Sequence, residues 1–109
     1  MKKKILKEIV TKTILIYMNA GFAFTSLDIC NHIRAEHPDK MVRYREITDM
    51  VKKLTLNIAQ SNSYQYNATL QTVDTTVGMG LAYLYHGKDF DPEDYLARDQ
   101  TTLQTLQTS

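Results

Sequence analysis

The hydrophobic pattern of this chain changes its period once, near Tyr64. Before that residue, apolar side chains recur at intervals of three and four, the spacing of one face of a helix. From Tyr64 onward they alternate with polar side chains, the spacing of a β-strand. A chain of 109 residues has room for a single modest core. The pattern therefore predicts one α+β domain, with three helices followed by a β-hairpin and then a short acidic helix or tail.

The first helix is predicted over Ile5–Asn19, where apolar residues wrap one side. Gly21 then ends it, because glycine readily adopts the left-handed backbone found just after many helices. Phe22 and Phe24 follow in alternation. They predict a very short extended segment that sends both rings into the core.

The second helix begins with a capping signal, since Thr25 or Ser26 precedes an apolar-periodic stretch. Asp28 lies in its first turn, where the helix dipole favours a negative charge. The helix is predicted to run to about Glu36, because a residue that precedes proline, here Pro38, is pushed out of the helical region.

The third helix contains the stretch RYREITDMVKKL, Arg43 to Leu54. One face carries the apolar residues Ile47, Met50, Val51 and Leu54. The opposite face carries Arg45, Thr48, Asp49 and Lys52. The apolar pattern allows this helix to continue through Ile58, before the polar run 60–65.

The hairpin is predicted from the alternation of Tyr66, Ala68 and Leu70 with polar residues, followed by a turn at Asp74-Thr75. The return strand should end at Gly87. It places Val77, Met79, Leu81, Tyr83 and Tyr85 on one face, and Gly78, Gly80, Ala82 and Leu84 on the other. The small residues on the second face would let a helix or another chain approach closely.

This order of elements resembles the winged-helix variant of the helix-turn-helix fold, in which a third helix is presented beside a β-hairpin wing. The resemblance rests on element order and on the stretches FTSLDI and RYREITDMVKKL, and covers Ile5 to about His86. One departure is that Thr55–Ser63 separate the third helix from the hairpin, so either that helix is extended or the wing loop is unusual. A generic small α+β domain is the alternative fold.

The charge is divided unevenly along the chain, although the net charge is only +1. Residues 1–73 hold eleven Lys and Arg against six Asp and Glu, a balance of +5. Residues 74–109 hold two against six, a balance of −4. We therefore expect a winged-helix-like domain over 1–87 and an acidic C-terminal segment over 88–109. Such a segment can compete with a polyanion for the basic body.

Signatures of catalysis and export are missing from the sequence. The three histidines lack the spacing of a metal site, and there is no phosphate-binding glycine loop. We expect no enzymatic activity, no cofactor and no metal. The single cysteine, Cys30, fits a reducing compartment, and no apolar run approaches a membrane span. Lys7 and Glu8 interrupt the stretch after MKKKIL, which argues against a signal peptide. A cytoplasmic location is expected.

The resemblance implies a DNA-binding protein, a small transcriptional regulator that uses the third helix and the hairpin tip on double-stranded DNA. Arg45 and Thr48 would read bases, and Lys52 and Lys53 would bind phosphate. A basic arm, Lys2–Lys4, would add charge. The full set of expected DNA-binding residues is Arg43, Tyr44, Arg45, Thr48, Lys52, Lys53, Asn62 and Gln65, with Asn62 and Gln65 at the hairpin tip. Asp49 on the same face would repel phosphate.

Two other uses of the scaffold stay open. The first is docking on another protein, either as an interaction module or as a small inhibitor encoded by a phage or plasmid. The near-zero net charge, the glycine-lined strand and the acidic end suit this use. The second is a homodimer, formed through Leu15 and Tyr17 of the first helix or through Leu103 and Leu106. A homodimer is compatible with either function.

Overall fold

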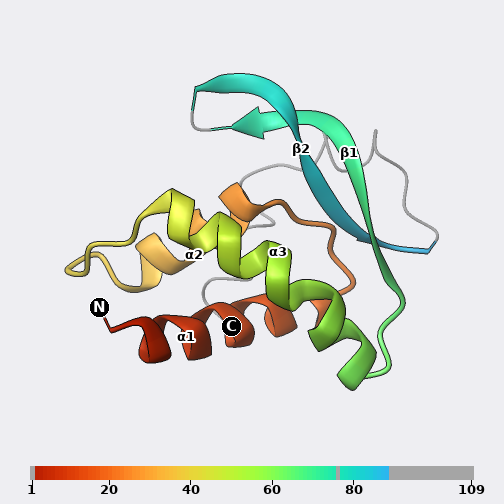
Figure 1. Cartoon of the computed structure of the whole chain (residues 1–109), viewed down its shortest axis with the longest axis horizontal. Coiled ribbons are helices and arrows are strands. Elements are labelled where there is room, and N and C mark those ends of the chain that lie inside the picture. Colours follow the sequence, from red (N-terminus) through yellow and green to blue (C-terminus); the bar gives the residue numbers. More distant parts are fainter. Residues whose placement is uncertain (1, 76, 89–109) are drawn as a thin grey trace.

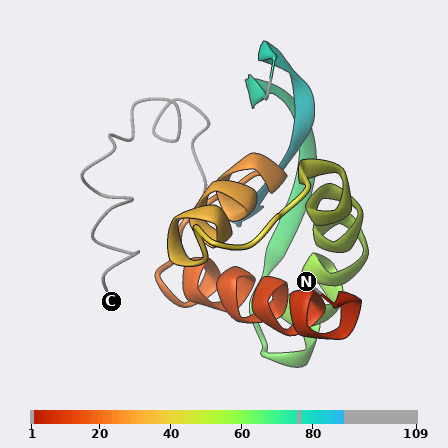
Figure 2. The same cartoon turned by 90° about the vertical axis from the view of Figure 1, so that its left-hand side faces the viewer.

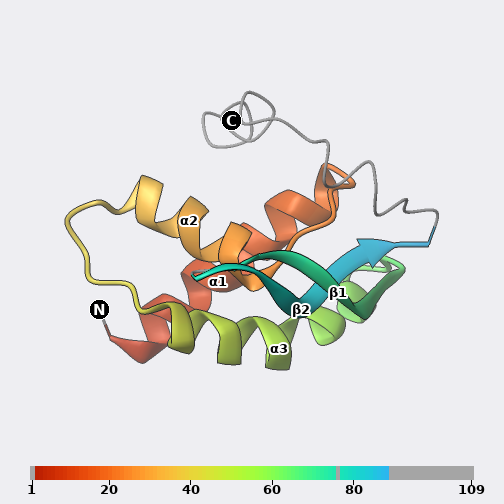
Figure 3. The same cartoon turned by 90° about the horizontal axis from the view of Figure 1, so that it is seen from above.

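A computed structural model describes residues 2–75 and 77–88 of the chain. It contains three helices and an antiparallel hairpin, in the order α1 (Lys3–Asn19), α2 (Ser26–Glu36), α3 (Tyr44–Ser61), β1 (Tyr66–Thr75) and β2 (Gly78–Gly87). The α+β class is therefore confirmed, and the layout is consistent with a winged helix. In Figure 1, α1 lies along one side of α3 and the hairpin along the other. Seen from above, the strands run between α2 and α3 (Figure 3).

The ends of the first two helices follow the signals in the sequence. Gly21 has a φ of 75°, and the chain closes α1 with the Phe22 N–H donating to the Tyr17 carbonyl at 2.9 Å. At the start of α2, the Asp28 N–H donates to Thr25 Oγ1 at 3.3 Å, and the Thr25 N–H donates to Asp28 Oδ2 at 2.9 Å. This reciprocal pair is a capping box, which satisfies two backbone donors that a helix start leaves open.

The core is formed by the inner faces of all three helices and the inner end of the hairpin. Phe24 is fully buried at its centre, and Phe22 is only partly buried against it. The backbones of Phe24 and Tyr85 exchange two hydrogen bonds of 2.9 Å, so the predicted extended segment pairs with β2. The Phe24 ring stacks on Tyr85 at 5.5 Å and meets Tyr17 edge-on at 5.7 Å. These contacts fix the hairpin to the helices.

Helix α3 is extended, which explains the residues between the third helix and the hairpin. Thr55, Ile58 and Ala59 continue its buried stripe, so the helix runs on to Ser61. Ser63 then adopts a left-handed φ of 61°, and the Tyr64 N–H donates to the Ala59 carbonyl at 2.8 Å. The chain enters β1 directly after this cap.

The placement of Asn62 and Gln65 at the hairpin tip was wrong. Asn62 caps α3, where its Nδ2 donates to the Ile58 carbonyl at 2.8 Å. Gln65 is exposed just before β1. Both lie at the inner end of the hairpin, because α3 runs on to Ser61 and β1 begins at Tyr66.

The turn also lies further along than predicted. The register runs without interruption from Tyr66 opposite Gly87 to Thr75 opposite Gly78. Asp74 and Thr75 are therefore strand residues, and the connection falls between Thr75 and Gly78. Gly78 has a φ of 112°, a conformation that glycine adopts without steric cost. The strands are thus each ten residues long.

The two faces of the hairpin have different surroundings. On one face Tyr66, Ala68 and Tyr85 pack against the core at the inner end, and the outer end of the same face is exposed. On the other face Val73 and Leu84 are each 1% exposed, although neither belongs to the main core cluster. Figure 2 shows the outer end of the hairpin extending beyond the helices.

Several expectations concern the acidic segment, which lies outside the described residues apart from Lys88. These are the helix start at Asp91, the contact through Leu103 and Leu106, and the competition for the basic body. Among the helices that the structure describes, none has both the length and the apolar character needed to cross a membrane.

Candidate nucleic-acid interface

Helix α3 separates into an inner and an outward face, as its sequence pattern predicts. Ile47 and Val51 are fully buried, and Met50 and Leu54 are partly buried beside them. The outward face, as we define it, consists of the exposed residues Arg45, Glu46, Asp49, Lys52, Lys53, Leu56, Asn57 and Gln60. Because the inner face alone holds α3 on the core, the outward face can meet a ligand without disturbing the fold.

The start of α3 is held by a clamp from α2. Nε and Nη2 of Arg34 donate to the Val42 carbonyl at 3.2 and 2.9 Å. Val42 itself is buried, so the residues that lead into α3 are anchored on both sides. Arg43 follows as the N-cap residue, with an exposed side chain that makes no capping hydrogen bond. The Arg34 hydrogen bonds therefore hold the backbone just before Arg43 in place, while the Arg43 side chain stays exposed.

Tyr44 and Thr48 are less available than their neighbours. Tyr44 is partly buried and packs against the core. Thr48 is also partly buried, and its Oγ1 donates to the Tyr44 carbonyl at 3.0 Å. The hydroxyl hydrogen of Thr48 is thus engaged by the helix backbone, which weakens its expected role as a reader of bases.

On the hairpin side of the outward face, Lys52 lies over an aromatic ring. Its Nζ is 5.9 Å from the centroid of Tyr83 in β2. This cation–π contact is at the outer limit of the useful range, so it orients the lysine without neutralising its charge. Arg45 lies seven residues earlier on the same side of the helix and is exposed. Two cations therefore line the border between α3 and the hairpin.

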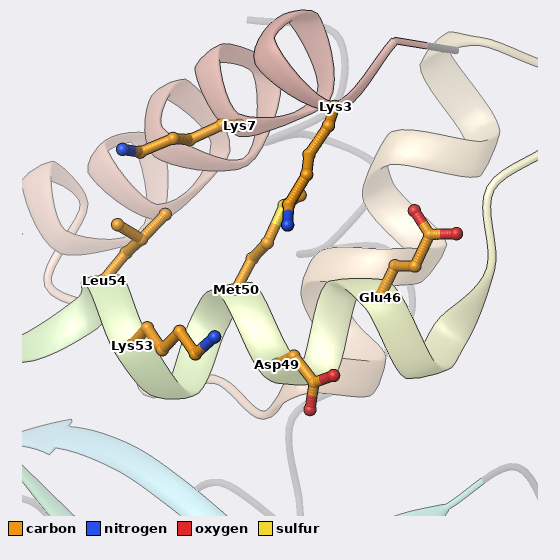
Figure 4. A pocket seen from close by; sticks show the side chains of 7 residues that line it. All are labelled: Lys3, Lys7, Glu46, Asp49, Met50, Lys53 and Leu54. Atoms are coloured by element: carbon orange, nitrogen blue, oxygen red, sulfur yellow. The ribbon is translucent and has the colours of Figure 1, made fainter.

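On the other side, a groove of about 490 Å³ runs between α1 and α3 (Figure 4). It is lined by Lys3, Lys7, Glu46, Asp49, Met50, Lys53 and Leu54. Figure 4 shows Lys3 reaching toward Met50, while Lys53 extends along α3 in the direction of Asp49. Within the described residues, no lysine of the groove comes within 4.0 Å of its carboxylates. Its three ammonium groups exceed its two carboxylates by one charge.

Lys7 was missed as a site residue by sequence reasoning, and Lys3 was expected only as part of a basic arm. The predicted basic arm is not an arm, because α1 begins at Lys3 and Lys4 belongs to its first turn. The signal that could have found the pair is their i, i+4 spacing, which puts both on one side of a helix. Only the packing of α1 beside α3 reveals that this side faces Lys53.

The lysines at the start of α1 lie at the unfavourable end of a helix dipole. The first turn of α1 contains no acidic residue, and Lys2 at the N-cap makes no side-chain capping bond. Positive charges near a helix N-terminus are destabilising by up to about 1 kcal/mol each when exposed. A bound anion would relieve this repulsion and accept hydrogen bonds from the open backbone N–H groups.

The expected DNA-binding residues therefore fall into three groups. Arg43, Arg45, Lys52 and Lys53 are exposed along the first half of α3. Tyr44 and Thr48 lie among them but are partly buried, as described above. Asn62 and Gln65 lie beyond the opposite end of α3, about 27 Å from its start at 1.5 Å per residue over 18 residues. The structure brings the first group together and separates it from the third.

Two titratable side chains of the described core, Cys30 and His32, lie in α2. Burial raises the pKa of the Cys30 thiol, an effect that Arg34 partly offsets, so the thiol stays protonated at neutral pH. His32 is fully buried in α2, with Nε2 2.9 Å from Glu36 Oε1. Neither side chain reaches the outward face of α3. The chemistry that this surface offers is recognition of charge and hydrogen-bonding groups.

Comparison with known proteins gives no match to a protein-family model, to a curated protein or to a solved structure. A function has to be inferred from the residues and geometry of the chain itself.

Proposed function

We propose that this chain binds double-stranded DNA through the outward face of α3 and the lysines of α1, and that it acts as a small transcriptional regulator in the cytoplasm. The observation that carries the proposal is the row of cations on both borders of α3. Arg45 and Lys52 stand on the hairpin side, and Lys53 lines the groove on the other side together with Lys3 and Lys7. An exposed helix with cations on both borders suits the major groove, where the helix lies between two phosphate backbones.

The roles of these cations differ by position. Arg43 and Arg45 stand at the start of α3, the end of a recognition helix that usually contacts base edges. An arginine can bind guanine O6 and N7 with two hydrogen bonds. Lys3, Lys7 and Lys53 are better suited to phosphate, which a flexible ammonium binds as a point charge. Phosphate at this groove would also lie close to the N-terminus of α1.

Asp49 and Glu46 oppose phosphate binding at the groove, since both line it. Their presence lowers the sequence-independent attraction that DNA exerts on a purely basic surface. A carboxylate on a recognition helix can instead accept a hydrogen bond from cytosine N4. We therefore assign Asp49 a selective role: it should weaken binding to DNA in general more than binding to the preferred site.

The proposed interface rests on α3 and α1 rather than on the hairpin tip. Of the tip side chains that the structure describes, Val77 and Met79 are apolar and exposed, at 95% and 60%. The expected contact between the hairpin tip and DNA stays a prediction.

Salt-dependent binding to duplex DNA tests the proposal. Arg45→Ala with Lys52→Ala, and separately Lys3→Ala with Lys7→Ala, should each weaken binding. Each lost phosphate contact should reduce the slope of log affinity against log salt by about one. Fluorescence anisotropy with a labelled duplex pool, followed by selection of a preferred site, gives both quantities.

The matched control is Lys12→Ala with Lys88→Ala, which removes two exposed cations outside the groove and the outward face. This variant should keep the affinity and slope of the parent. Melting temperatures should change little in all three variants, because exposed substitutions usually stay within about 0.5 kcal/mol. An interface variant that binds with the parental salt slope contradicts the proposal.

Docking on another protein is the second candidate function. The exposed apolar side chains of the outer hairpin favour it, because such clusters typically mark protein contacts. If the parent binds no duplex more tightly than the interface variants do, an interaction module or small inhibitor becomes the better explanation. Affinity capture with the parent and with Leu81→Lys then identifies partners that depend on the hairpin.

A further inference from the structure

The outer half of the hairpin exposes a row of apolar side chains on one face. We define the outer hairpin face as Leu70, Thr72, Met79, Leu81 and Tyr83. The register pairs Leu70 with Tyr83 and Thr72 with Leu81, and residues directly opposite one another lie on the same face. Met79, Leu81 and Tyr83 alternate along β2 and share that face too. Their exposed fractions are 60%, 69% and 44%, and that of Leu70 is 58%.

The composition of this face is inverted relative to an ordinary solvated strand. A strand on the surface usually turns polar side chains outward and apolar ones inward. Here the four large apolar side chains expose on the order of 400 Å² together, which lies within the roughly 300–600 Å² of the largest patches on monomers. A two-stranded ribbon is also marginal in water unless it packs against something. The outer hairpin face is therefore a candidate contact surface, although Val73 and Leu84 on the opposite face of the hairpin are buried.

We propose that the partner is a second copy of this chain, with the two outer hairpin faces packed against each other about a two-fold axis. Two such faces with their borders bury roughly 1,000 Å², the size of a weak but specific interface. A two-fold contact requires a self-complementary patch. Among the described side chains of this face, Leu70, Met79, Leu81 and Tyr83 are large and apolar and Thr72 is uncharged, which meets this requirement.

Helix α1 offers no comparable surface. Tyr17, one of the residues first considered for dimer contact, is 2% exposed and packs on Phe24 and His32. Leu15 is partly buried against the core. Ile5 and Ile16 are exposed but lie eleven residues apart, roughly 16 Å along the helix axis. The hairpin dimer is independent of DNA binding, and its tests are made without DNA.

The first test is the oligomeric state of the full chain, measured by sedimentation equilibrium from low-micromolar to near-millimolar concentration. The parent should show a reversible monomer–dimer equilibrium. Leu81→Lys should raise the dimer Kd by about a hundredfold or more, because the two-fold axis buries two unpaired ammonium groups. Ile5→Lys is the matched control, since it adds the same charge at an exposed apolar site on α1, and it should dimerise like the parent.

Three results would overturn the proposal: a parent that stays monomeric throughout, a Leu81→Lys variant that dimerises like the parent, or an Ile5→Lys variant that is weakened equally. Circular dichroism of each variant verifies that it is folded. If Leu81→Lys does not fold, the cross-linking experiment below decides the matter with a milder substitution.

The second test uses the burial of the natural cysteine. Cys30 is the only cysteine of the sequence and is fully buried, so an introduced surface cysteine reacts selectively. Thr72→Cys lies in the outer hairpin face and should form covalent dimers with a short bis-maleimide. Asn31→Cys, exposed on α2, should remain monomeric under the same conditions. Equal yields for the two variants would contradict a contact through the hairpin.

Discussion

Tyr85 and Tyr83 lie two residues apart on the same face of β2, yet Tyr85 is 3% exposed and Tyr83 is 44% exposed. Tyr85 belongs to the inner half of the hairpin. There Phe24 pairs with its backbone and stacks on its ring, and the Tyr66 hydroxyl donates to the Phe22 carbonyl at 2.7 Å. Tyr83 belongs to the outer half, where Lys52 Nζ lies 5.9 Å from its ring centroid.

The difference between the two halves has a geometric cause. Both halves share one alternation of side chains and one continuous register. The extended segment around Phe24 pairs with β2 only at Tyr85, however, and the strands continue for several residues past this point. Alternation determines which side chains share a face, whereas the position of the pairing segment determines how much of that face is covered. In the outer half, this face therefore carries large apolar side chains that no other segment covers within the described residues.

The strongest test of this comparison truncates the two tyrosines separately. Tyr85→Ala should lower the free energy of unfolding by about 3–5 kcal/mol, as for other buried aromatic residues. Tyr83→Ala should cost less than about 1 kcal/mol in the monomer, because much of its ring already contacts water. Urea denaturation at low protein concentration measures both without the contribution of a dimer. Equal losses would mean that the halves are not energetically distinct.

Much of the helical part could be predicted because its signals are local. The capping box at Thr25, the end of α1 near Gly21 and the inward stripe through Ile47 each depend on residues within a few positions of one another. The length of α3 and the position of the turn were not predictable in the same way. Thr55 and Ile58 can continue a helix or lie in a loop, and only their burial against the rest of the domain decides.

The candidate site was predictable only in part for a related reason. The exposure of Arg43, Arg45, Lys52 and Lys53 follows from the helical period of α3 alone. The contribution of Lys3 and Lys7 depends on how α1 packs beside α3, which no local pattern specifies. The outer hairpin face shows the same limit, since its apolar residues appear as core material until the covering segment is located.

A second test examines the inner half through the partly buried side chain of Tyr66. Burial, with a smaller contribution from Tyr64, raises the pKa of Tyr66 from 10.0 to about 12. The unfolded chain therefore loses this proton at lower pH than the folded chain does, and stability should fall as pH rises from about 10 to about 12. At neutral pH the free energy of unfolding of Tyr66→Phe should be about 1 kcal/mol lower than that of the parent, because the hydrogen bond to Phe22 is lost. At alkaline pH the free energy of unfolding of this variant should fall less steeply than that of the parent.

Melting temperatures recorded between neutral pH and pH 12 for the parent and Tyr66→Phe measure this difference. The two curves should converge as the pH rises, because the ionisation that penalises the parent is missing from the variant. Curves that stay parallel would show that the pKa of Tyr66 does not differ between the folded and unfolded states. The Tyr66 hydroxyl would then be more accessible to water than its contacts indicate.

The smallest expected effect concerns the residue that precedes the inner half. Ser63 adopts a φ of 61°, whereas Gly21 holds the corresponding left-handed position after α1 with a φ of 75°. A side chain in this region meets the neighbouring carbonyl, so Ser63→Gly should raise the free energy of unfolding by up to about 1 kcal/mol. The gain is limited because glycine also increases the entropy of the unfolded chain. Gly21→Ser is the reciprocal variant and should lose a similar amount, measured by urea denaturation. If Ser63→Gly instead destabilised the protein, the serine side chain would have to stabilise the folded state by more than the strain in its backbone costs.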